Sequence, residues 1–136
     1  MRNSMFDIFI AGMDTTATTL SWSLLYMMRW PDVQEKVQEE LDRVIAEGET
    51  PSLAHRPLTP YTEATLLEVQ RFSCIVPWGP RATLQDVQIG NHTIPKDTHV
   101  LYLIRAVTHN EELFPRPNEF RPERFLSEDG TKFIKN

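Results

Sequence analysis

Residues 6–27 read Phe-Asp-Ile-Phe-Ile-Ala-Gly-Met-Asp-Thr-Thr-Ala-Thr-Thr-Leu-Ser-Trp-Ser-Leu-Leu-Tyr-Met. Apolar side chains recur along this stretch at alternating spacings of four and three, which predicts one stripe of an α-helix. The stripe consists of Phe6, Ile10, Met13, Ala17, Leu20, Leu24 and Met27. Further large apolar residues lie off the stripe, so the helix is apolar around much of its circumference. We therefore expect it to sit inside a protein larger than itself.

The same stretch is a poor candidate for a membrane anchor or a signal peptide. Asp7 and Asp14 interrupt it, and six Thr or Ser hydroxyls fill its centre. An Asp at mid-membrane costs about 2.5–3.5 kcal/mol. A signal peptide needs a basic start and a small-residue cleavage site, and Arg2 is the only early cation. We expect a buried soluble helix.

Pro31 ends this helix, because proline lacks a backbone donor and restricts the residue before it. Further elements follow in order. They are a helix over Asp32–Ala46, a third helix with Thr59 as N-cap running to about Phe72, a hairpin of Val87–Ile89 with Thr93–Ile94 around Gly90-Asn91, a strand over Val100–Ile104, and a short helix over Arg105–His109. Prolines at 115, 117 and 122 preclude long elements afterwards. The pattern predicts a mainly α fold with a small β-sheet.

Composition narrows the class of protein. The 136 residues carry 14 Lys+Arg against 19 Asp+Glu, a net charge of −5, with 40% hydrophobic and 24% charged residues. This is typical of an ordinary globular chain of about one domain. The acidic balance argues against binding to nucleic acid, which needs clustered cations. With Cys74 as the single cysteine and four scattered histidines, we expect neither a disulfide framework nor a metal site built within this chain.

Four local features carry candidate chemistry. They are Ala11 to Thr16, which puts glycine, an acid and two hydroxyls inside an apolar helix; Glu68 and Arg71 at i, i+3; Val76 to Arg81, an extended apolar segment ending in a guanidinium; and Phe120 to Phe125, which sets two arginines and a glutamate between aromatic rings. Each has a structural explanation when taken singly. In the order given, these are close helix packing, a solvated ion pair, the start of a strand with a surface arginine, and a cluster of polar side chains held in coil by aromatic rings.

In this order and at these separations, the four features resemble the C-terminal part of a cytochrome P-450, a haem-thiolate monooxygenase of the microsomal animal type. Ala11 to Thr16 is similar to the family's central-helix motif, Glu68-x-x-Arg71 to its ExxR helix, and Phe120 to Phe125 to its PERF segment. The resemblance covers residues 1–136. It implies a partial cytochrome P-450 fold with a long central helix, two following helices, a β-hairpin region and a meander coil.

The resemblance also implies roles for individual residues. Ala11 and Gly12 would lie over the haem, Thr15 would donate a hydrogen bond during oxygen activation, and Asp14 would help to relay protons. Arg81 would bind a haem propionate. Glu68, Arg71 and Arg124 would form a structural polar network. The substrate-lining positions would be Phe6, Ile10, Val76, Trp78 and Gly79. Two departures from the family pattern are Asp97 where glycine is usual and Arg116 where aspartate is usual.

The implied cofactor is haem b, with electrons from NADPH through a reductase. The implied partners are NADPH-cytochrome reductase, cytochrome b5 and a small apolar substrate. The parent protein would lie on the cytosolic face of the endoplasmic reticulum membrane, attached through an N-terminal anchor that these residues do not include. The family's cysteine ligand to iron is expected beyond Asn136, and Cys74 lacks the surrounding pattern. The alternative is a catalytically inactive truncated or splice product that cannot ligate haem iron and that aggregates through its first helix.

Overall fold

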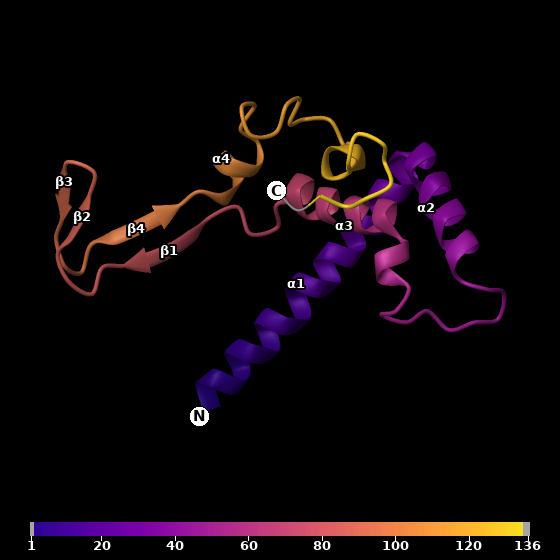
Figure 1. Ribbon diagram of the computed structural model, residues 1–136. Helices are drawn as coiled ribbons and strands as arrows, with labels where there is room; N and C mark the ends of the chain where they lie inside the picture. The colour runs from indigo at the N-terminus through magenta and orange to yellow at the C-terminus, as the bar shows by residue number, and fades with distance from the viewer. Residues whose placement is uncertain (1, 135–136) are drawn as a thin grey trace. The chain divides into compact units, whose positions relative to one another are not determined.

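The computed structural model describes residues 2–134 (Figure 1). Its residues group into two compact units, one formed by Met1–Ile75 with Asn118–Asn136 and the other by Val76–Pro117. The first unit holds α1, α2, η1, α3 and η2, and the second holds the four strands and α4. The expectation that residues 1–136 form one domain stays a prediction.

The long first helix is confirmed. α1 spans Arg2–Arg29 without a break, and α2 follows directly as Pro31–Val44. Trp30 between them is the last residue to donate to α1, through Trp30 N–H to the Tyr26 carbonyl at 2.9 Å. α2 ends two residues before the expected Ala46, because Ile45 is already extended, with φ −107° and ψ 116°.

The third helix is also confirmed and begins with an unexpected cap. α3 spans Pro60–Ser73 after the short 3₁₀-helix η1, Arg56–Leu58. Thr59 occupies the N-cap position as predicted, but its hydroxyl donates to the Arg56 carbonyl at 3.2 Å and caps nothing in α3. The first free N–H groups of α3 instead donate to the side chain of Glu40 on α2.

An aromatic core holds the first unit together. Tyr26, Val33, Val69 and Phe120 are buried, and partly buried aromatic rings pack against them. Trp30 stacks on Phe120 with ring centroids 4.5 Å apart and planes 16° apart, while Phe72 meets both Tyr26 and Trp30 edge-on. Phe120 comes from the segment before η2, Pro122–Phe125, so the core joins the helices to this segment.

The second unit consists of two antiparallel ribbons. β1, Gly79–Ala82, pairs with β4, His99–Tyr102, and the predicted hairpin forms as β2, Val87–Ile89, with β3, His92–Ile94. The hairpin continues from the end of the β1–β4 ribbon (Figure 1). The strand expected over Val100–Ile104 stops at Tyr102, because Ile104 already begins α4, Ile104–Thr108.

The fold class is confirmed: helices dominate, with a small β region of two two-stranded sheets. After α4 the chain has no long element as far as the structure is described, as the prolines predict. Within residues 2–134, none of the helices is long and apolar enough to cross a membrane.

Candidate functional site

A buried ion-pair network lies where α3 meets the segment before and within η2. The spacing of i, i+3 puts Glu68 and Arg71 on one face of α3, and both are buried, at 0% and 4% exposed. Arg71 donates two hydrogen bonds to the Glu68 carboxylate, from Nε to Oε2 at 2.7 Å and from Nη2 to Oε1 at 2.8 Å. A bidentate pair of this kind fixes both side chains in one geometry.

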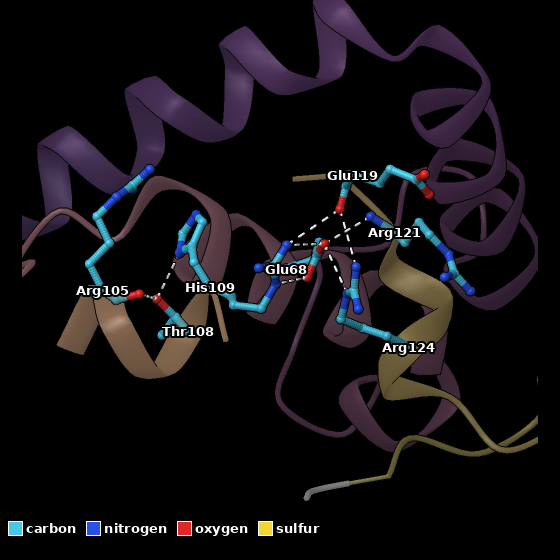
Figure 2. Close-up of polar contacts among 8 residues, drawn as sticks. Glu68, Arg105, Thr108, His109, Glu119, Arg121 and Arg124 are labelled. Carbon is cyan, nitrogen blue, oxygen red and sulfur yellow. Dashed lines mark hydrogen bonds and ion pairs between the residues drawn. The ribbon is translucent and has the colours of Figure 1, made fainter. Parts of the chain in front are cut away.

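Residues more than 50 positions later complete the network (Figure 2). Arg124 Nε donates to Glu68 Oε1 at 3.1 Å, and the backbone N–H of Arg121 donates to the same oxygen at 2.8 Å. The Glu119 carbonyl accepts from Arg124 Nη2 at 3.2 Å and from Arg71 Nη2 at 3.4 Å. The predicted grouping of Glu68, Arg71 and Arg124 is therefore present in the structure.

The buried charges of this network cost desolvation free energy. Burial lowers the pKa of the Arg124 guanidinium, the positive charges of Arg71 and Arg121 lower it further, and Glu68 opposes the shift. Removing one partner of a buried pair leaves an uncompensated charge and costs about 3–5 kcal/mol. The hydrogen bonds from Arg121 and to Glu119 offset part of the desolvation. The network can thus hold residues 119–124 against α3.

The predicted oxygen-activation residues lie on an exposed stretch of α1. Asp14 and Thr15 are exposed, as are Ala11 and Gly12. The Thr15 hydroxyl donates to the Ala11 carbonyl one turn earlier at 2.7 Å, so its proton is held on the helix backbone. Thr15, Thr16 and Thr19 line an open hollow of about 300 Å³ together with Gln70 of α3. The hollow is open to solvent, and three of the residues that line it carry hydroxyl groups.

The residues predicted to line substrate and to bind a propionate divide between the two units. Phe6 and Ile10 lie on α1, with 64% and 47% of their surfaces exposed. Val76 and Trp78 are exposed in the second unit, and Gly79 is buried there. The roles of all five as substrate-lining residues stay predictions.

Arg81 has two contacts on the β1–β4 ribbon. Its Nη1 donates to the Pro80 carbonyl at 2.9 Å, and its guanidinium carbon lies 5.3 Å from the ring centroid of Tyr102. The side chain is exposed, which suits a guanidinium that is to bind an external carboxylate.

Cys74, the single cysteine of the chain, lies at the C-cap position of α3. It is 7% exposed and ends α3 with a left-handed backbone at φ 41°. No group of three or more His, Cys, Asp or Glu side chains suited to a metal ion occurs within residues 2–134.

The structural roles of two residues, Glu40 and Tyr102, were not predicted from the sequence. Glu40 continues the stripe of Val33 and Val37 on α2 at helical spacing, so a charged residue on a buried face was the available signal. Tyr102 had no comparable signal, because its place opposite Gly79 depends on the register of two strands separated by a nested hairpin.

Comparison with known proteins agrees with the predicted resemblance. The family model described as Cytochrome P450 matches residues 1–136. Rat cytochrome P450 1A1 is 47% identical over 128 residues, which cover 93% of this chain and 24% of that protein. Human cytochrome P450 2W1 is 46% identical over 129 residues, covering 95% of this chain and 26% of that protein.

A solved structure agrees in fold. A zebrafish cytochrome P450, solved with abiraterone, superposes with a TM-score of 0.87 at 38% identity, covering 91% of this chain and 31% of that chain. The chain thus spans about a quarter of the length of the curated relatives it matches.

Proposed function

Since the chain belongs to the cytochrome P450 family, we propose that it is one part of a haem monooxygenase. The complete protein would insert one atom of O₂ into an apolar organic substrate and reduce the other to water with two electrons and two protons. The observation that carries the proposal is the family match over residues 1–136. The activity belongs to a longer protein, because the chain corresponds to about a quarter of its relatives.

The residues present fit a haem. Ala11 and Gly12 are adjacent exposed positions of α1 with no side chain larger than a methyl group, and a Cβ added at Gly12 would meet no atom within 4 Å outside its chain neighbours and the nearby backbone of its own helix. A flat ring could therefore lie against these two positions. Arg81 would hold a carboxylate of the haem through its exposed guanidinium. The haem iron would supply the chemistry of oxygen activation, and its cysteine ligand would come from outside these 136 residues.

Thr15 and Asp14 would handle protons beside the haem. Thr15 lines the hollow, and its hydroxyl donates its proton to the Ala11 carbonyl. A rotation about its side chain would turn the same proton toward a ligand, because a hydroxyl is both donor and acceptor. The exposed Asp14 carboxylate would exchange protons with solvent and pass them to this site.

The other predicted residues would support this chemistry. Glu68, Arg71 and Arg124 would have a structural role, holding the segment after residue 118 against α3. Phe6 and Ile10, with Val76, Trp78 and Gly79, would line the path of the apolar substrate. Electrons would come from NADPH through NADPH-cytochrome reductase, with cytochrome b5 as a second donor. The complete protein would lie on the cytosolic face of the endoplasmic reticulum membrane.

The test uses a chimera in which this chain replaces the matching segment of rat cytochrome P450 1A1. The chimera should bind haem and, when reduced under carbon monoxide, show the Soret band of a thiolate-ligated haem. The 136-residue chain with added haem should not show that band. A chimera that folds but takes up no haem would refute the proposal.

Thr15→Ala in the chimera tests the proton role. With reductase and NADPH, we expect the variant to release more hydrogen peroxide and to form less product per NADPH, by roughly tenfold or more, because positioned proton donors contribute about 10²–10⁴-fold. Ser21→Ala is the matched control, since Ser21 makes the same kind of bond, to the Ala17 carbonyl at 2.9 Å, on another side of α1. Equal coupling in both variants would contradict the role of Thr15.

A further inference from the structure

Gly79 and Tyr102 face each other across the β1–β4 ribbon, and the tyrosine ring covers the glycine. The two residues are direct partners in the strand register. A Cβ added at Gly79 would lie 2.0 Å from the Tyr102 hydroxyl oxygen and 2.2 Å from Cζ. Such distances are far inside van der Waals contact. The ring can take this position only because residue 79 has no side chain.

The same ring also contacts Arg81. Side chains alternate along a strand, so Gly79 and Arg81 lie on one face of β1, together with their partners Tyr102 and Val100 on β4. Arg81 reaches the Tyr102 ring along the diagonal, with the guanidinium carbon 5.3 Å from the ring centroid. This is within the range of about 6 Å for a cation–π contact.

From these contacts we propose that Tyr102 is a positioning residue for Arg81. Its ring, seated over Gly79, supplies a flat surface that holds the guanidinium on this face of the ribbon, while the Pro80 carbonyl holds one of its nitrogens. A long, exposed arginine otherwise loses rotamer entropy when it binds a carboxylate, and prior stacking removes part of that loss. The role of the carboxylate as a haem propionate rests on the proposed function.

Gly79 has a structural role in this arrangement. The glycine leaves the space that the Tyr102 ring occupies, so it acts on Arg81 through the ring. The three residues on this face of the ribbon therefore act in sequence. Gly79 leaves room for the Tyr102 ring, and the Tyr102 ring orients Arg81.

The first test measures the stacking directly in the 136-residue chain, without haem, with Phe6→Gln and Phe9→Gln in every sample to weaken association through the exposed side chains of α1. The NMR signal of the Arg81 side-chain Nε–Hε group should be shifted upfield by the Tyr102 ring. Tyr102→Phe keeps the ring and should keep the shift. Tyr102→Leu and Gly79→Ala should both return the signal to the position of a free arginine, the second by displacing the ring. Leu101→Ala, on the opposite face of β4, is the matched control and should leave the signal in place.

The second test measures haem retention in the chimera, by transfer of haem to apomyoglobin. Tyr102→Leu should release haem roughly two- to fivefold faster, the factor expected for one exposed cation–π contact, and Tyr102→Phe should match the unsubstituted protein. In an Arg81→Ala background, Tyr102→Leu should have no further effect. An unshifted Arg81 signal in the unsubstituted chain, or equal haem loss from the Leu and Phe variants, would overturn the proposal. If the chimera holds no haem, the proposed function fails, and the NMR result still decides the role of Tyr102.

Discussion

Asp97 has a backbone conformation that side chains other than glycine rarely adopt. Its φ is +62°, at the third position of the turn from Pro95 to Thr98, which the Thr98 N–H closes on the Pro95 carbonyl at 3.4 Å. A positive φ at this position, with none at Lys96, is typical of a type II turn, which favours glycine at its third position. The departure from the family pattern at Asp97 is therefore a local strain.

Asp97→Gly should relieve that strain. We expect the second unit to become more stable by about 0.5–1 kcal/mol, because a left-handed non-glycine residue costs about 1–2 kcal/mol and glycine loses part of this gain in entropy. Urea unfolding followed by amide NMR signals of β1 and β4 measures the change. Lys96→Gly is the control: the preceding residue has no positive φ, so the same substitution there should destabilise. Equal effects at the two positions would contradict the argument.

The buried network shows what single residues contribute to the proposed site. Glu68 accepts four hydrogen bonds, two from Arg71, one from Arg124 and one from the Arg121 backbone. The ExxR spacing could be found in the sequence, because an i, i+3 pair always shares a helix face. The backbone contacts at Arg121 and Glu119 could not, since they depend on how a coil segment folds onto α3.

Among the elements, α3 depends on α2 for its N-terminal cap. The Glu40 carboxylate accepts Tyr61 N–H at 2.9 Å on Oε1, and Thr62 N–H and Thr62 Oγ1, both at 2.7 Å, on Oε2. Glu40 is 5% exposed. A negative charge at a helix N-terminus is favourable, and here it also satisfies backbone donors that Thr59 leaves free.

Glu40→Gln should weaken the docking of α3 on α2. We expect a loss of about 1–3 kcal/mol in unfolding free energy. The NH₂ group of the glutamine would face the N–H groups of Tyr61 or Thr62, which are donors too, and the negative charge would be lost. Urea unfolding followed by tryptophan fluorescence measures the loss, with Trp78→Phe in every sample so that Trp22 and Trp30, near the aromatic core, are the reporters. Glu39→Gln, the exposed neighbour on α2, is the matched control and should change stability little. If Glu40→Gln leaves the unfolding free energy unchanged, the Glu40 cap does not stabilise α3.

Sequence patterns predicted α1, α2, α3 and the β2–β3 hairpin well, because each rests on local information: apolar period, proline stops and a Gly-Asn turn. The pairing of β1 with β4 was beyond such patterns, since Gly79 and Tyr102 are 23 positions apart and meet only across the register. The end of the strand at Tyr102 was missed for a similar reason. The run from Val100 to Ile104 is β-rich, yet Arg105 N–H bonds to the Pro77 carbonyl and Ile104 turns into α4. Tertiary contacts override propensity there.

At the scale of the whole molecule, the first half of α1 carries apolar side chains that the described chain does not bury. They include Met5 at 74% exposed, Phe6 at 64%, Ile8 at 73%, Phe9 at 63% and Met13 at 57%. Only near Tyr26 does α1 enter the aromatic core. Contiguous exposed apolar surface of this kind favours association, whereas single exposed apolar residues do not.

We therefore expect the isolated chain to self-associate through α1 at micromolar concentrations. Phe6→Gln with Phe9→Gln should weaken association roughly tenfold or more, because burying each phenylalanine contributes about 1 kcal/mol or more even when partial. Glutamine keeps the helix propensity, so the helix itself should persist. Sedimentation equilibrium measures the constant, and circular dichroism checks the helix.

The control for that prediction separates a continuous surface from mere exposure. Leu53 and Leu84 are 86% and 87% exposed, more than either phenylalanine, but each stands in a loop. Leu53→Gln with Leu84→Gln removes as many apolar side chains and should leave association unchanged. If the two double variants weaken it equally, general apolar exposure drives association and α1 has no special part. If only the phenylalanine pair matters, α1 is the surface that a larger protein would have to cover.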